Sequence, residues 1–248
     1  MHNDQVARLR LCVNEFTDKH GSTLTRQVEE HSSLVLQWLS YLNSYHRTGT
    51  ADELLAAYSS AIRETSACLA LGMIRPALFA MRTQIDLILA WIYFKDHPKE
   101  WHRINKTGEG FKLKKELFDY LSNYYAGFGT RYGILKQISK RKEEDMYRLL
   151  SAHIHGQSNP VLPVTVQLSD VVRSEESCKE VAMSTGDLAE YISDVLYATY
   201  AEQLHSIPKE IVKSIVSVQR HHLTIFNALN YPQTFFERIT NGITDTSA

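Results

Sequence analysis

Hydrophobic residues recur at intervals of three and four along almost the whole chain of 248 residues, and only six prolines interrupt them. This spacing places the apolar side chains along one side of successive α-helices. It predicts helices over residues 4–19, 23–46, 51–71, 75–95, 111–125, 130–141, 143–155, 186–206 and 208–229. Glycines mark several of the expected breaks, because glycine can leave a helix through positive φ. The pattern therefore predicts an all-α helical bundle.

One segment departs from the helical spacing. The stretch QSNPVLPVTVQLS, residues 157–169, contains two prolines and then alternates apolar with polar residues, which is typical of an extended arm or a short edge strand. We therefore expect a helical body over residues 1–156, an extended arm over 157–184 and C-terminal helices over 185–248. The C-terminal helical pair is small for an independent domain, so we expect it to dock on the body.

Composition is that of an ordinary globular protein, with 44% hydrophobic residues and a formal net charge of −1. The three cysteines are too few and too far apart for a disulfide framework or a clustered zinc site, and they favour a reducing compartment. The N-terminus lacks the features of a signal peptide, and the most apolar run, Leu87–Phe94, is too short to cross a bilayer. We expect a cytoplasmic protein with no membrane partner.

The neutral total conceals a basic region. Residues 95–142 carry twelve Lys or Arg against five Asp or Glu, which leaves fifteen against 23 elsewhere, and eight aromatic residues are interleaved with them. Mixed basic and aromatic character suits a surface that neutralises phosphates and stacks unpaired bases. The same pattern also arises when aromatic residues face a core and lysines face solvent. The candidate RNA-binding residues in this region are Arg131, Lys136, Lys140 and Arg141.

The predicted helix that ends in YRLLSAHIHG, residues 147–156, concentrates polar chemistry. His153 falls on a stripe with the apolar residues Met146, Leu149 and Leu150, whereas Arg148 and His155 fall together on another stripe with Ser151. The two histidines point about 200° apart, so they cannot bind one metal ion together while the helix is intact.

Arg148 and His155 share a face but are separated by about 10 Å along the helix. An arginine can neutralise a phosphate, and a histidine can exchange protons near neutral pH. Together they could let a ribose 2′-hydroxyl attack its own phosphate without a metal or another cofactor. Alternatively, His153 is a packed core histidine and Arg148 pairs with a carboxylate.

An arginine followed after four to six residues by a histidine, on the last helix of an all-α bundle, resembles the HEPN superfamily of helical ribonucleases. This chain offers both Arg148 to His153 and Arg148 to His155. The resemblance implies a homodimer whose motif helices face each other, with Arg148 at the scissile phosphate and His155 or His153 as acid or base. This chain differs from the family pattern in one respect: family members carry a polar residue directly after the arginine, where this chain has Leu149.

Arg82 and Asp86 lie four residues apart on the otherwise apolar helix at residues 74–94, so they need partners. Superfamily members often orient the motif side chains with an acidic residue from an earlier helix, which makes Asp86 the candidate here. We therefore expect Asp86 to contact the motif helix, and Arg82 and Ser151 to act beside it. Alternatively, Arg82 and Asp86 only satisfy each other.

These observations lead to two hypotheses. The first is a metal-independent endoribonuclease of HEPN type, acting as a toxin or in anti-phage defence and restrained by an antitoxin or sensor protein. The second is a non-catalytic helical scaffold that binds a protein or nucleic acid. The sequence contains neither a Walker-type phosphate loop nor GxGxxG, which argues against an ATPase or a dinucleotide enzyme.

Overall fold

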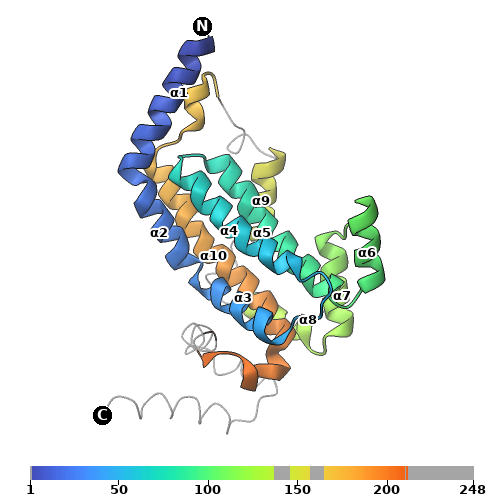
Figure 1. Cartoon of the computed structure of the whole chain (residues 1–248). Helices are drawn as coiled ribbons and strands as arrows, with labels where there is room; N and C mark the ends of the chain where they lie inside the picture. Colours follow the sequence, from blue (N-terminus) through green and yellow to red (C-terminus); the bar gives the residue numbers. More distant parts are fainter. Residues whose placement is uncertain (1, 137–145, 157–164, 210, 212–248) are drawn as a thin grey trace, which may run out of the picture. The chain divides into compact units, whose positions relative to one another are not determined.

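The computed structural model describes residues 2–136, 146–156, 165–209 and 211. The chain divides into two units, residues 1–203 and 204–248. Every regular element in the described ranges is helical, which confirms the all-α prediction (Figure 1). The elements are α1 (His2–Phe16), the π-helical turn η1 (Thr17–Gly21), α2 (Ser22–His31), α3 (Ser33–Tyr45), α4 (Glu53–Ala70), α5 (Ile74–Phe94), α6 (Pro98–Thr107), α7 (Lys114–Tyr124), α8 (Phe128–Lys136), α9 (Met146–His155), the 3₁₀ turn η4 (Leu168–Val171), α10 (Glu175–Tyr200) and η5 (Ala201–Ser206).

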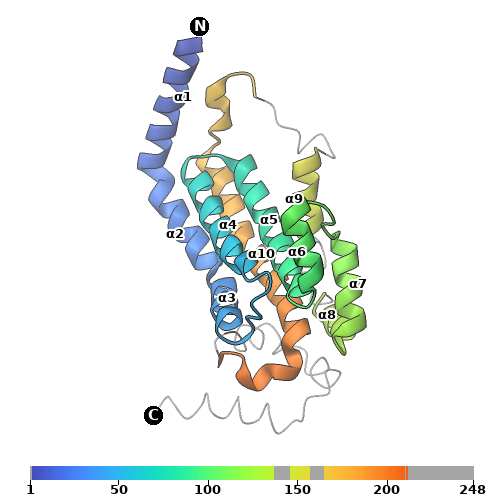
Figure 2. The same cartoon turned by 45° about the vertical axis from the view of Figure 1, so that its right-hand side comes forward.

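The core of the first unit is built around α5 and α10. The α4 helix packs along α5, and α10 packs against α2, α3, α5 and α8 (Figures 1 and 2). The largest fully buried side chains include Trp38, Trp91, Tyr58 and Tyr197. The Trp38 indole N–H donates a hydrogen bond of 2.8 Å to Ser193 Oγ, which ties α3 to α10 inside this core.

The apolar helix α5 has the length and composition to cross a membrane, but 72% of its most apolar 18-residue window is buried inside the protein. It is the one helix with such a composition among the described residues. From Ala77 onward, almost every turn of α5 has buried residues, because α4, α7, α9 and α10 pack against it. Residues 88–94 of the most apolar run are all buried in the core.

The C-terminal part of the first unit differs from the prediction. The α10 helix begins at Glu175, and Ser174 caps it by accepting a hydrogen bond from the Ser177 N–H at its Oγ. The last ten residues of the arm expected over 157–184 are therefore helical. Residues 168–171 form a 3₁₀ turn, which overlaps the end of the segment 157–169 that was expected to be an extended arm or a short edge strand; residues 157–164 of that segment lie outside the described residues. The α10 helix, which includes the start of the expected C-terminal helices, packs in the core of the same unit as α2 to α9, and the division between the two units falls after residue 203.

Two further differences concern helix boundaries. The predicted helix at 23–46 is interrupted at Ser32, between α2 and α3. The α6 helix was not predicted at all; it has proline at its first position and ends at Gly108, whose φ of 70° lies in the left-handed region. The predicted helix at 208–229 lies almost entirely outside the described residues.

Candidate functional site

The α9 helix carries the motif and packs against α5 and α10. Its buried residues are Met146 and Leu150, which are spaced four apart and therefore lie on one face. This burial fixes which side of α9 is turned inward and leaves the remaining side chains at its edges or toward solvent.

Arg82 of α5 links the two helices. Its Nε donates a hydrogen bond of 3.1 Å to Ser151 Oγ on α9, and its guanidinium is ion-paired with Asp86 on its own helix. The Arg82 side chain is only 12% exposed, so this charge depends on those partners. Arg82 therefore makes the hydrogen bond between the two helices, and Asp86 pairs with its guanidinium from the same helix. We expected Asp86 itself to contact the motif helix, but in these contacts it is Arg82 that reaches α9.

Two cations lie close to the Tyr147 ring. The Arg82 guanidinium carbon is 3.6 Å from the ring centroid, and Lys114 Nζ, from the start of α7, is 4.2 Å from the same centroid. Cations are attracted to the negative faces of aromatic rings. Lys114 Nζ also lies 5.3 Å from the Tyr191 ring of α10, so this cluster joins α5, α7, α9 and α10.

Sequence reasoning missed Tyr147 and Lys114. The only signal available was that Tyr147 precedes Ser151 by one helical turn, which puts both on the side of α9 that faces Arg82. Nothing in the sequence related Lys114 to this helix.

Arg148 and His155 are both exposed on α9. They form no hydrogen bond or ion pair with another described residue that would occupy them. Ser151, expected on the same stripe, lies at its edge and turns to Arg82. The structure therefore keeps Arg148 and His155 on one open side of the helix, still separated by about 10 Å of helical rise.

His153 occupies a different environment. It is half-buried, and burial lowers the pKa of its imidazole because desolvation disfavours the charged form. Its position beside the buried stripe agrees with the interpretation as a packed histidine. Of the two motif histidines, His155 has the open access that a group exchanging protons with a substrate requires.

Among the candidate RNA-binding residues, Arg131 is engaged in packing. Its guanidinium donates to the Ala198 carbonyl at 3.4 Å and to Glu202 at 3.2 Å, and the side chain is only 12% exposed. Arg131 therefore holds α8 to the end of α10 and is a poor candidate for binding phosphate. Lys136 is exposed. Lys140 and Arg141 lie outside the described residues.

Most aromatic residues of the basic region contribute to packing. The hydroxyl groups of Tyr120 and Tyr125 donate to Asp96 Oδ2 at 2.9 and 3.1 Å, and Phe128 is buried. Two remain open to solvent: Phe111 is 57% exposed and Tyr124 76% exposed. The core-facing interpretation thus holds for much of the region, but not for all of it.

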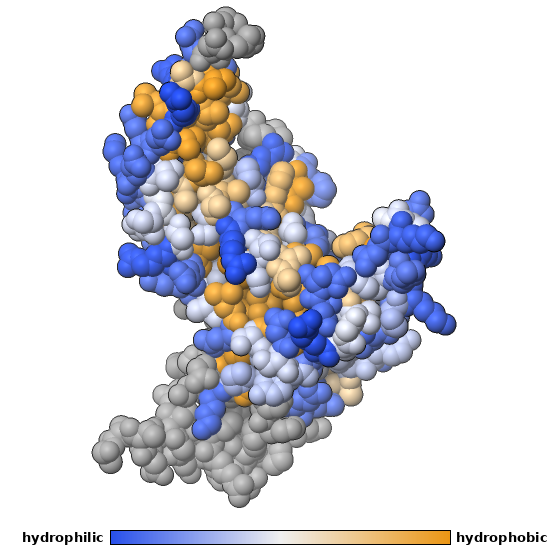
Figure 3. Space-filling view, in the orientation of Figure 1, coloured by the Kyte–Doolittle hydropathy of each residue, from blue (hydrophilic) through white to orange (hydrophobic). Residues whose placement is uncertain are grey.

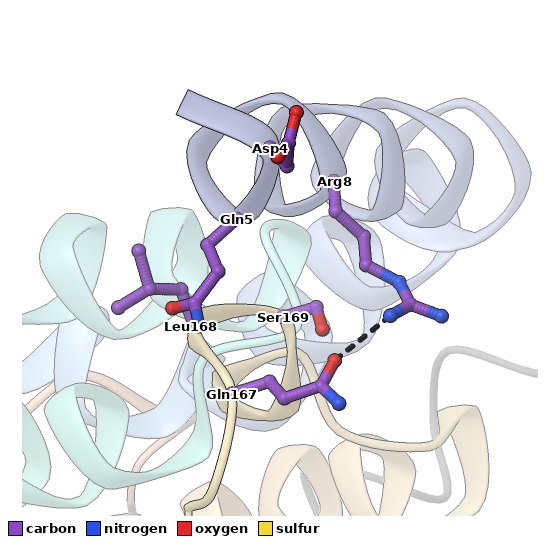
Figure 4. A pocket seen from close by; sticks show the side chains of 6 residues that line it. All are labelled: Asp4, Gln5, Arg8, Gln167, Leu168 and Ser169. Atoms are coloured by element: carbon purple, nitrogen blue, oxygen red, sulfur yellow. Dashed lines mark hydrogen bonds between the residues drawn. The ribbon is translucent and has the colours of Figure 1, made fainter. Parts of the chain in front are cut away.

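A shallow pocket lies between α1 and η4, away from the motif. It is lined by Asp4, Gln5, Arg8, Gln167, Leu168 and Ser169 (Figure 4). Across it, Arg8 Nη1 donates a hydrogen bond of 2.9 Å to Gln167 Oε1. None of the residues predicted for catalysis contributes to this pocket.

No family model, curated protein or solved structure matches the chain. Within the described ranges, no group of three or more His, Cys, Asp or Glu side chains is arranged to hold a metal ion. The chemical groups open to a substrate on α9 are a guanidinium and an imidazole.

Proposed function

We propose that the protein is a metal-independent endoribonuclease of HEPN type whose active site forms between the α9 helices of two copies. The observation that carries the proposal is the joint exposure of Arg148 and His155 on one side of α9, while Met146 and Leu150 hold the other side in the core. A guanidinium and an imidazole are the two groups that the reaction needs.

The distance of about 10 Å between Arg148 and His155 along α9 is the reason for a second copy. In an antiparallel pairing of two α9 helices about a twofold axis, residue numbers that sum to the same value face each other. A crossing centred between Ser151 and Ala152 places Arg148 opposite His155 of the partner subunit, and His155 opposite the partner's Arg148. This symmetric arrangement would form two equivalent sites, as a twofold interface requires.

In this site the ribose 2′-hydroxyl attacks the adjacent phosphorus while His155 accepts its proton. Arg148 neutralises the charge that develops on the phosphate oxygens. The bond from phosphorus to the 5′-oxygen breaks, and that oxygen receives a proton from water. The products are a 2′,3′-cyclic phosphate and a 5′-hydroxyl.

The test is incubation of the purified full chain with single-stranded RNA in the presence of EDTA. Arg148→Ala and His155→Ala should each lower the cleavage rate by roughly 10²- to 10⁴-fold, the usual contribution of one acid or base group. Exposed Arg75 and His31 supply matched control variants, Arg75→Ala and His31→Ala, which should cut normally. A dimeric wild-type protein that leaves varied RNAs intact contradicts the proposal.

The biological role proposed with this activity is that of a cytoplasmic toxin or anti-phage effector, held in check by an antitoxin or sensor protein. The HEPN resemblance supports this role. An RNase that acts on cellular RNA requires such restraint.

A second candidate function is a non-catalytic scaffold on the same fold. Half-buried Leu149, where family members have a polar residue, favours it, since an apolar side chain there supplies no chemistry to the phosphate. This candidate predicts that Arg148→Ala alters the binding of a protein partner while RNA remains uncut by the wild-type protein.

A further inference from the structure

The α6 helix carries a basic stripe, which we define as Lys99, His102, Arg103 and Lys106. These residues follow the spacing i, i+3, i+4, i+7, and all four are exposed. The spacing places them within about 100° of one another around the helix and along about 10 Å of its length. Figure 3 shows a hydrophilic surface over this part of the protein, at the right of the view.

The opposite side of α6 is occupied by packing. Ile104 is buried, and the Trp101 ring lies 5.3 Å from that of Phe94. Glu100 accepts a hydrogen bond of 3.1 Å from the Tyr93 hydroxyl and is ion-paired with Lys112 at 3.3 Å. The acidic residue within α6 is thus paired on the packed side, with Tyr93 and Lys112 and not with the basic stripe.

The loop that follows α6 carries an exposed aromatic ring. The Arg103 guanidinium lies against Gly110, where an added Cβ would approach Arg103 Nη2 to 2.6 Å. Phe111 follows Gly110 directly and is 57% exposed. Folding of the loop after α6 therefore brings Arg103 against the residue that precedes the exposed Phe111, and Glu109 is the acidic residue of this loop.

The same loop leads to the motif helix. Three residues after Phe111, Lys114 begins α7, and its Nζ lies 4.2 Å from the centroid of the Tyr147 ring. Tyr147 directly precedes Arg148. A strand that lies along α6 and crosses Phe111 would therefore continue toward the proposed catalytic residues.

We propose that the basic stripe and Phe111 bind single-stranded RNA and guide it to Arg148. The inference rests on the proposed function for its choice of RNA. A row of cations along one helix face neutralises successive phosphates, and an exposed ring stacks an unpaired base, which a duplex does not offer. These residues differ from the RNA-binding candidates that the sequence suggested further along the chain.

The experiment measures binding of the full chain to a fluorescent single-stranded RNA with 2′-O-methyl riboses, which the proposed reaction cannot cut. Neutralising the stripe with Lys99→Gln, Arg103→Gln and Lys106→Gln should weaken binding and reduce the slope of log affinity against log salt by about 2, since each phosphate contact to a single strand contributes about 0.7. Phe111→Ala should weaken binding roughly tenfold with the slope unchanged.

The matched control is another triple neutralisation, Lys19→Gln, Arg26→Gln and Arg63→Gln, at exposed residues elsewhere on the same unit. It should bind as the wild type does. Equal weakening by both triple variants, unchanged binding by Phe111→Ala, or equal affinity for duplex RNA would overturn the inference. Binding that follows the expected pattern, combined with intact ordinary RNA in the cleavage assay, would refute the nuclease and leave the RNA surface standing.

Discussion

Arg82 of α5 donates a hydrogen bond from Nε to Ser151 Oγ of α9 at 3.1 Å, although 69 residues separate them in the chain. The same guanidinium is paired with Asp86 and lies over the Tyr147 ring. One largely buried cation therefore adds polar contacts between α5 and α9 to the packing of Met146 and Leu150. Ser151 lies on the helix that also carries Arg148 and His155, so this contact helps to hold that helix in place.

Replacing Arg82 with methionine should destabilise the first unit. Arg82→Met keeps much of the apolar length but removes the hydrogen bond to Ser151 and leaves Asp86 without its cation. We expect the free energy of unfolding in urea to fall by about 2 kcal/mol, a moderate value because Asp86 can still reach water. Arg75→Met, at an exposed position on the same helix, should change it by less than about 0.5 kcal/mol. Equal effects of the two substitutions would show that Arg82 is dispensable for packing.

The buried hydrogen bond between Trp38 and Ser193 predicts a coupling between α3 and α10. Trp38→Phe leaves the Ser193 hydroxyl buried without its donor, and Ser193→Ala leaves the indole N–H without its acceptor. Each single change should cost about 1–3 kcal/mol, in addition to any loss of packing volume. The double variant should cost less than the sum, and a double-mutant cycle by urea unfolding measures the difference. Strict additivity would contradict the coupling.

Two glycines with similar backbone conformations should respond differently to alanine. Gly72 and Gly49 have φ of 76° and 78°, which disfavours a side chain at both. An added Cβ at Gly72 would approach a Val172 methyl to 2.8 Å and Phe16 to 3.2 Å, whereas it would meet nothing within 4 Å at Gly49. Gly49→Ala should therefore cost about 1 kcal/mol and Gly72→Ala at least about 2 kcal/mol. Comparable melting temperatures for both variants would argue against the close approach at Gly72.

His46 should make stability depend on pH. Burial, and then the nearby charge of Lys95, lower the pKa of its imidazole in the folded state. The unfolded chain then binds a proton more readily, so stability is full above the ordinary histidine pKa of about 6.5 and declines as the pH falls from there toward the lowered value. His46→Phe keeps a ring against Tyr41 and Tyr200 but cannot titrate. Unfolding measured between about pH 7.5 and 5.5 should show a shallower decline in the variant, and an unchanged decline would exclude His46 as its source.

The spacing of hydrophobic residues was enough to predict an all-α protein and most of its helices, because long amphipathic elements repeat their pattern over several turns. It failed where the inward residues are few or small. In α6 the packed side is mainly Trp101 and Ile104, and in the first turns of α10 the buried residues are Cys178, Ala182 and Thr185. The two inward residues of α6 are too few to establish a period. The small residues of α10 differ little in hydrophobicity from their polar neighbours, although they pack well.

The sequence predicted only those features of the candidate site that depend on geometry within a single helix. Helical geometry placed Arg148 with His155 and separated them from His153, and the exposure of these side chains follows that division. The contacts of Tyr147 with Arg82 and Lys114 could not be predicted, because they depend on how α5 and α7 pack against α9. Likewise, the engagement of Arg131 by α10 is a tertiary contact that a count of charges does not reveal.

The central place of α10 also bears on the order in which the protein is made. Its partners α2 and α3 leave the ribosome first, yet the residue that receives the Trp38 indole hydrogen bond follows 155 positions later. Contacts so distant in sequence form slowly, and apolar surface that waits for its partner invites aggregation. During synthesis the N-terminal helices must therefore remain partly uncovered until α10 emerges, and nascent chains that stop before Glu175 should depend on chaperones to stay unaggregated.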